Sequence, residues 1–174
     1  MLLTADAELA RRARQLAGFG PPADADGSTV DLEGYNAQMS GVQAAALRVK
    51  LDCLDEWLAR RRAIAQVYSA ACDRLGLARL RPPAGTEPVW RAFAIFVPER
   101  TEALRRLQAA GVEASPHFVP ALHLRPLYRH LGYGRGDFPV AEAASDHLIC
   151  LPVHPQLSEA EVSRVVAALE TLVA

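Results

Sequence analysis

Residues 147–162 have the sequence HLICLPVHPQLSEAEV, which contains the patterns that decide the fold. The run HLICLPV is almost entirely apolar and is ended by Pro152 and Pro155, as expected of a short buried strand. Ser158 with Glu161 three residues later is a capping-box pattern, in which each side chain binds the other residue's free backbone N–H at a helix start. We therefore expect a strand followed directly by an amphipathic helix that continues to the C-terminus.

Two more strands are predicted upstream of this stretch. The run VWRAFAIFVP at residues 89–98 is aromatic and β-branched, and VEASPHFV at residues 112–119 is a second candidate that Pro116 interrupts. A helix over residues 101–110, ended by Gly111, separates the two strands. A Pro-rich loop and two short helical pieces are expected after the second one.

A long helical stretch is predicted before the strands. Ser40 and Gln43 form another capping-box pattern, apolar residues then recur at helical steps as far as Leu75, and Gly76 is a suitable end. Three consecutive arginines at residues 60–62 break the apolar pattern. This break predicts either a kink or two helices placed end to end.

The N-terminal region contributes a short helix and a loop. The helix is expected over residues 5–17 with Thr4 as its cap, and residues 21–34 gather Pro, Gly, Asp and Ser into a loop. The predicted fold class is therefore α/β, with a small α+β domain in which long helices pack on a small sheet.

Composition excludes several classes of partner. The 174 residues are 51% hydrophobic and 22% charged with a formal net charge of -1, which is typical of one globular domain and leaves no basic excess for nucleic acid or anionic lipid. No apolar run is long enough for a signal peptide or a membrane span. The three cysteines lie far apart, which favours reduced thiols and a cytoplasmic location.

Lysine content restricts the chemistry most. Lys50 is the only lysine of the chain, so Schiff-base chemistry by this chain alone would have to use it. Its surroundings, QAAALRVKLDCL, place it in the middle of a helix without a glycine-rich phosphate cradle. A water-facing lysine on an amphipathic helix is the better explanation.

The histidines and two polar segments offer weaker candidates. His117 is as well explained by a ligand contact as by a structural role, because it lies on an irregular segment between prolines, whereas a structural role is the better explanation for His123 and the other three. A zinc site would have to combine residues that no metal-binding spacing supports, namely His117, His123, Cys150 and His154. GYGRGDF at residues 132–138 is interpreted as a mobile surface turn rather than a nucleotide loop, and Asn36 as a turn or cap residue.

Several runs nevertheless resemble one family in order and spacing. They are MLLTADAELARRARQLAGFG, GYNAQMSGVQAAAL, LDEWLARRRAIAQVY, LQAAGVEASPHFVPALH and GYGRGDFPVAEAASDHLICLPVHPQLSEAEV. Together they are similar to the C-terminal part of the DegT/StrS nucleotide-sugar aminotransferases, of the aspartate aminotransferase (fold type I) superfamily. The resemblance implies that residues 1–38 are a remnant of the large pyridoxal-phosphate (PLP) binding domain with its loop, and that residues 39–174 are the small domain.

The resemblance also implies roles for individual residues. Asn36 matches the asparagine that reaches the PLP phosphate of a partner subunit, and His117 with Phe118 matches an aromatic pair at the sugar-nucleotide pocket, with Tyr35 and His123 as further substrate-side residues. Ala37 and Gln38 depart from the family pattern, because an aromatic and then a basic residue are usual there. The implied cofactor is PLP, and the implied assembly is a homodimer or a pair with a full-length subunit.

By the same resemblance the Schiff-base lysine would lie upstream of Met1. We therefore expect the chain to be the C-terminal half of an aminotransferase with a late start or a split gene, and to be inactive alone. The alternative is a non-catalytic module that binds a full-length aminotransferase. Expressed alone, the chain is expected to self-associate through the apolar edge of helix 40–75 and the loop at 21–34.

Overall fold

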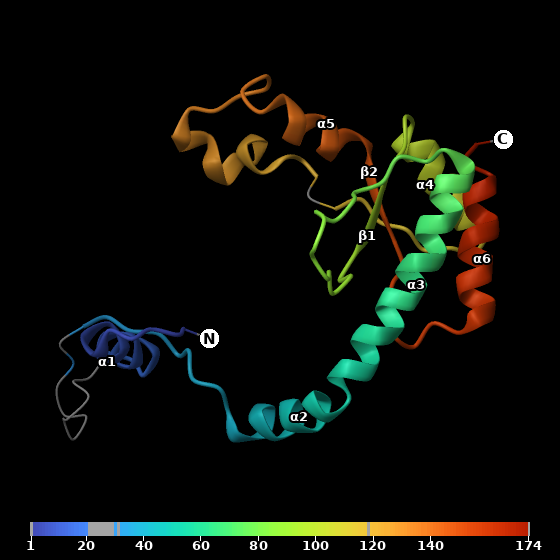
Figure 1. Ribbon diagram of the computed structural model, residues 1–174. Coiled ribbons are helices and arrows are strands. Elements are labelled where there is room, and N and C mark those ends of the chain that lie inside the picture. Colours follow the sequence, from blue (N-terminus) through green and yellow to red (C-terminus); the bar gives the residue numbers. More distant parts are fainter. Residues whose placement is uncertain (1, 21–29, 31, 118, 174) are drawn as a thin grey trace. The chain divides into compact units, whose positions relative to one another are not determined.

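A computed structural model describes residues 2–20, 30, 32–117 and 119–173 of the chain (Figure 1). It contains two compact units, Met1–Asp52 and Cys53–Ala174, which are taken one at a time below. Among the described residues, no helix has both the length and the apolar character needed to cross a bilayer.

The first unit contains two helices with side-chain caps. Helix α1 spans Ala7–Ala17, and its N-cap is Asp6, whose carboxylate accepts from the backbone N–H groups of Glu8 and Leu9. The prediction of Thr4 as the cap was wrong, because Thr4 Oγ1 instead accepts from the backbone N–H of Asp6. Helix α2 spans Gly41–Asp52 and begins with the predicted reciprocal Ser40–Gln43 hydrogen bonds.

Helix α3, Leu54–Leu75, opens the second unit and passes through the three arginines without a break. The predicted interruption at residues 60–62 was wrong, and the helical run is instead interrupted at Cys53. The arginines break the apolar pattern because two of them bind distant segments. Arg60 reaches the carbonyl of Leu157, and Arg61 reaches those of Trp90 and Val153. The predicted end at Gly76 is confirmed by its left-handed conformation.

The sheet has two antiparallel strands, β1 (Phe93–Phe96) and β2 (Leu148–Leu151), paired from Phe93↔Leu151 to Phe96↔Leu148. Strand β1 is shorter than predicted because Trp90 has a φ of 47°, which is outside the extended region. The predicted strand over residues 112–119 was wrong. Of the residues described in this range, only Ser115 pairs, in an isolated bridge to Cys150.

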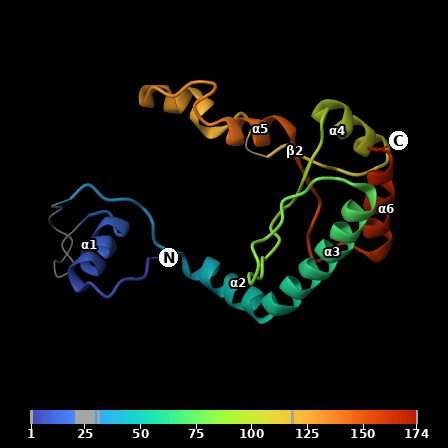
Figure 2. The ribbon, with the colours of Figure 1, turned by 45° about the horizontal axis from the view of Figure 1, so that its top comes forward.

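Three helices cover this sheet and close the hydrophobic core. They are α3, α4 (Arg100–Ala109) and α6 (Glu159–Glu170), and α3 and α6 run side by side in both views (Figures 1 and 2). The Ser158–Glu161 capping box at the start of α6 is present as predicted. The largest fully buried side chains come from all of these elements: Tyr68, Phe93, Ile64, Ile95, Leu107, Ile149, Leu169 and Cys72.

Between the bridge at Ser115 and strand β2 the chain forms three short helices. They are the 3-10 helices η1 (Leu122–Leu124) and η2 (Pro126–Leu131) and the helix α5 (Pro139–His147), one more than the two short helical pieces predicted. Helix α5 is tied to the rest of the unit, since Arg100 donates to the Ser145 carbonyl and the ring of His147 lies 3.1 Å from the Pro98 carbonyl. Helix α5 therefore has a fixed position relative to the sheet.

Candidate functional site

In the first unit, backbone hydrogen bonds hold Tyr35 and Asn36 against the end of α1. The N–H of Tyr35 donates to the Leu16 carbonyl at 2.7 Å, and the N–H of Phe19 donates to the Tyr35 carbonyl at 3.3 Å. Asn36 forms an antiparallel bridge with Gly18. Both predicted side chains are exposed on this backbone platform, Tyr35 to 70%, so each is available to a ligand or a partner chain.

Two glycines make the platform compact. A Cβ on Gly34 would lie 2.4 Å from the backbone nitrogen of Gly20, and a Cβ on Gly20 would lie 1.6 Å from the Leu32 carbonyl oxygen. Real side chains do not tolerate such contacts, so the segments on both sides of the loop meet only because these residues are glycines. The side chain of Gln15 adds a 3.0 Å hydrogen bond to the Gly20 carbonyl.

The surroundings of Lys50 do not suit a Schiff-base site. It is exposed in the last turn of α2, a helix that has no buried residue. A Schiff-base lysine is typically enclosed in a pocket with its cofactor, whereas the Lys50 amine is exposed on a helix face. The geometry therefore agrees with the water-facing role that its sequence context favours.

In the second unit, the predicted substrate-side residues His117 and His123 have different surroundings. His117 is half-buried, and Phe118 lies outside the described residues. His123 is on η1, where its Nε2 lies 3.1 Å from Oε1 of Glu142 on α5. Only 9% and 8% of these two side chains are exposed, so His123 is engaged inside the protein through Nε2.

Glu142 is a functional candidate that the sequence did not reveal. Besides His123, its carboxylate accepts from the backbone N–H groups of Gly136, at 2.8 Å, and Phe138, at 3.3 Å. Burial alone would raise the pKa of the Glu142 carboxyl, but these hydrogen bonds together keep the pKa below its usual value. A carboxylate that accepts hydrogen bonds from several donors is ionised and fixed in place.

The glycine-rich turn that Glu142 binds is exposed but held in place. Asp137 accepts from the N–H of Gly134 at 2.7 Å, and Arg135 lies 3.3 Å from Asp146. Phe138 packs on the ring of His123 with a centroid distance of 4.8 Å, and Tyr133 packs on Phe138 at 5.1 Å. Residues 132–138 thus form an exposed surface turn, and these hydrogen bonds and ring contacts link it to η1 and α5.

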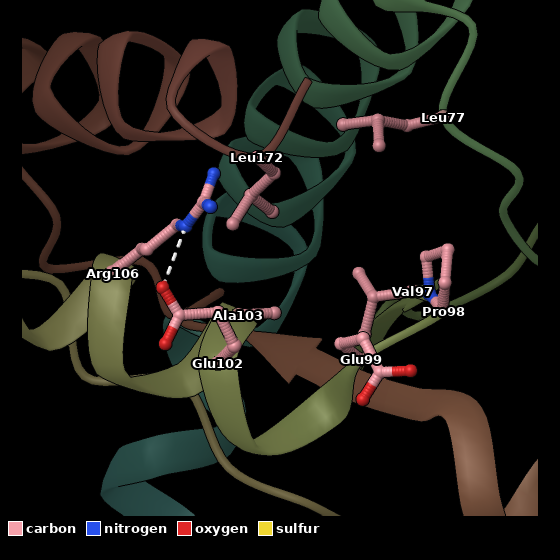
Figure 3. A pocket seen from close by; sticks show the side chains of 8 residues that line it. All are labelled: Leu77, Val97, Pro98, Glu99, Glu102, Ala103, Arg106 and Leu172. Atoms are coloured by element: carbon pink, nitrogen blue, oxygen red, sulfur yellow. Dashed lines mark hydrogen bonds and ion pairs between the residues drawn. The ribbon is translucent and has the colours of Figure 1, made fainter. Parts of the chain in front are cut away.

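A separate cavity of about 230 Å³ lies among β1, α4 and the end of α6 (Figure 3). Its apolar floor includes Leu77 and Leu172, and its rim carries Glu102, which pairs with Arg106 at 2.9 Å. Hydrogen bonds from Arg105 and then from Arg106 lower the pKa of Glu102 to about 2. A carboxylate with so low a pKa is a poor proton acceptor near neutral pH, so Glu102 does not act as a general base there.

The zinc set that the sequence left open combines His117, His123, Cys150 and His154. Within residues 2–20, 30, 32–117 and 119–173, no three His, Cys, Asp or Glu side chains gather in a way that could hold a metal ion. Cys150 is buried on β2, and burial raises the pKa of its thiol. Such a thiol behaves as a small apolar group.

The architecture of long helices on a small sheet is that of the C-terminal part of a fold type I PLP aminotransferase. The crystal structure of DesV from S. venezuelae has the same fold, with a TM-score of 0.88 and 31% identity over 97% of this chain and 45% of DesV. Residues 1–170 match the DegT/DnrJ/EryC1/StrS aminotransferase family, and the chain belongs to it.

Curated relatives agree with this membership. The chain is 35% identical to the erythromycin biosynthesis sensory transduction protein EryC1 of Saccharopolyspora erythraea, over 97% of the chain and 46% of EryC1. It is 33% identical to the dTDP-3-amino-3,4,6-trideoxy-alpha-D-glucose transaminase of Streptomyces venezuelae, over 97% of the chain and 44% of that enzyme. The chain therefore spans about half the length of the curated relatives it matches.

The residues of this chain do not by themselves fit PLP. A putative sugar aminotransferase from Streptococcus pneumoniae, solved in its PMP form, has the same fold with 25% identity and a TM-score of 0.87. In the present chain the platform offers the exposed amide of Asn36, whereas Lys50, the only lysine, is on α2 and not on that platform. The platform therefore offers an exposed amide but no lysine to a cofactor.

Proposed function

We propose that this chain forms the C-terminal part of a PLP-dependent aminotransferase that transfers an amino group from glutamate to a keto-sugar nucleotide or a keto-cyclitol. The observation that supports this proposal is the agreement with DesV over 97% of the chain at a TM-score of 0.88. In the proposed enzyme, residues 1–38 belong to the large PLP-binding domain with its loop. Residues 39–174 form the small domain.

The chain's own residues would serve the edge of the active site. Asn36, exposed on its platform, would donate a hydrogen bond from its side-chain amide to the phosphate of PLP held by a partner subunit, in a homodimer or with a full-length subunit. Tyr35 in the first unit and His117 in the second would each contact the sugar nucleotide, and the resemblance gives the same role to Phe118. PLP supplies the electron sink for the transfer, and the lysine that attaches it is not Lys50.

A second candidate function is a non-catalytic module that completes or regulates a full-length aminotransferase. It is favoured by the position of the core, since every residue of the hydrophobic core cluster lies in the unit Cys53–Ala174. A unit with its own core can fold and bind a partner without taking part in chemistry.

The test is reconstitution in trans. The chain would be co-expressed with the S. venezuelae transaminase from which the matching segment has been removed, and 2-oxoglutarate formation from glutamate would be measured with a keto-sugar nucleotide as acceptor. We expect activity that depends on both pieces. Asn36→Ala should lower it by about tenfold or more, since it removes a hydrogen bond to a charged phosphate, while Lys50→Ala should leave it unchanged.

The outcomes separate the candidates. Loss of activity in Lys50→Ala would overturn the proposed division of roles, because the chain would then provide its own Schiff-base lysine. A stable complex without activity, together with binding to the intact transaminase, would favour the non-catalytic module. The absence of both complex and activity would contradict both proposals.

A further inference from the structure

The segment that carries His117 is anchored at both ends to one continuous piece of chain. At its start, Ser115 and Cys150 exchange two backbone hydrogen bonds, of 3.1 Å and 2.8 Å. At its end, His123 lies 3.1 Å from Glu142. Helix α5 and strand β2 follow each other without a gap, so both anchors bind to the same continuous stretch of chain.

The two anchors differ in kind. The first consists of backbone groups, which a side-chain substitution leaves in place. The second depends on the Glu142 carboxylate, which also holds the N–H groups of Gly136 and Phe138. Glu142 of α5 thus binds two other pieces of chain, η1 and the turn at residues 132–138.

The charges around Glu142 fix the direction of the His123 hydrogen bond. Arg135 lies 3.8 Å from the second Glu142 oxygen and 3.3 Å from Asp146, and the carboxylate of Asp137 is bound to the N–H of Gly134. These surroundings favour the ionised Glu142 carboxylate, which has no proton to donate and can only accept a hydrogen bond from His123. His123 must then carry its proton on Nε2, and its ring is further held by Phe138.

We propose that Glu142 is a positioning residue of the substrate side: through His123 it holds the segment that carries His117 in the place where His117 meets the sugar nucleotide. This inference rests on the proposed function. It assigns His123 an indirect role, because its Nε2 and one ring face are already occupied inside the protein.

The inference is tested with three variants in the reconstituted enzyme. Glu142→Ala removes the acceptor, Glu142→Gln keeps an acceptor oxygen on a side chain of the same length, and Glu113→Ala removes an exposed carboxylate from the segment before Ser115 as a matched control. Glu142→Ala is expected to raise the KM for the sugar nucleotide by about tenfold to 100-fold, because small misplacements of binding groups have effects of this size. The kcat of Glu142→Ala should stay within about twofold of the wild-type value. Glu142→Gln should restore the KM most of the way to the wild-type value, and Glu113→Ala should leave the KM unchanged.

Two measurements on the chain itself show whether the anchor has been opened. In the wild type, nitrogen NMR of His123 should report the Nε2–H tautomer, and the Gly136 and Phe138 amides should exchange slowly. In Glu142→Ala the Nε2–H tautomer signal and the slow exchange of these two amides should be lost, while the amides of the hydrophobic core still exchange slowly.

The failures are distinguishable. An opened anchor with an unchanged KM would overturn the positioning role alone. An equal KM defect in Glu142→Gln and Glu142→Ala with the anchor intact in the Gln variant would also contradict it. Inactive wild-type reconstitution would overturn the proposed function, and the inference with it.

Discussion

Arg61 of α3 donates from one nitrogen to the carbonyl oxygens of both Val153, at 2.6 Å, and Trp90, at 3.0 Å. The two acceptors follow β2 and precede β1, so a single guanidinium joins the ends of the two strands to the longest helix. The same side chain explains why the residue at 90 can keep a φ of 47°, since its carbonyl is fixed from outside the strand.

Replacing Arg61 with alanine should therefore destabilise the second unit. Two hydrogen bonds from a charged donor are lost, and we expect a decrease of about 1.5–3 kcal/mol in the free energy of unfolding. Arg74→Ala is the control, because the Arg74–Glu170 pair is about half exposed and such pairs contribute at most about 1 kcal/mol. Urea denaturation followed by circular dichroism measures both, and equal effects of the two variants would contradict the role of Arg61.

Arg61 also shows where sequence reasoning reaches its limit. Both capping boxes were predicted because their partners are three residues apart, and the hydrogen bonds confirm them. The arginines at residues 60–62 suggested a helix break because their partners lie far away in the chain. Helical periodicity assumes that polar residues face water, and it fails where a charge binds distant carbonyls.

The candidate site likewise contains residues that could be predicted from the sequence and one that could not. The resemblance picked out Asn36 and His117 by position, but Glu142 has no local pattern that marks it. Its importance comes from His123, nineteen residues away, and from the N–H groups of a turn that looked unattached. In a single sequence a glutamate on an amphipathic helix is indistinguishable from a solvated one.

Tyr68 predicts a dependence of stability on alkaline pH. Its ring is fully buried and its hydroxyl donates to the Pro152 carbonyl at 3.1 Å. Burial raises the pKa of Tyr68 to about 12, with a smaller opposing effect from Arg60. Because the unfolded chain then loses this proton at lower pH than the folded protein, the contribution to stability is intact below pH 10 and is lost as pH rises from about 10 to 12.

Tyr68→Phe isolates this contribution. At neutral pH the variant should lose about 0.5–1.5 kcal/mol with the hydrogen bond, and above pH 10 its stability should fall less steeply than that of the wild type. The buried thiols of Cys72 and Cys150 also have raised pKa values, and they are common to both proteins. Denaturation curves at several alkaline pH values measure the slopes, and parallel slopes would refute the assignment.

The platform that presents Asn36 should depend on Gly34. In Gly34→Ala the new Cβ would lie 2.4 Å from the backbone nitrogen of Gly20, so the two segments must separate. We expect faster amide exchange at Phe19 and Tyr35, whose N–H groups hold the platform together. Gly41→Ala is the matched control because nothing lies within 4 Å of its Cβ, and its exchange pattern should equal that of the wild type. Unchanged exchange in Gly34→Ala would show that the platform does not need this close approach.

Helix α2 should make the chain self-associate. It buries no residue, and its apolar side chains are open to solvent, with Val42 exposed to 83% and Val49 to 69%. Seven residues apart, these two valines lie on the same face of the helix, and a contiguous apolar face of this kind favours association. We expect light scattering after size exclusion to show species larger than the monomer. The double variant Val42→Glu/Val49→Glu should shift them toward the monomer.

The added charge must be separated from the lost apolar surface. The variant Gln108→Glu/Gln156→Glu adds the same two negative charges at exposed positions of the second unit and should leave the association unchanged. If both double variants dissociate the protein equally, net repulsion rather than the α2 face is responsible. A wild-type chain that stays monomeric at all concentrations would contradict the prediction itself, because the exposed valines would then have no measurable tendency to associate.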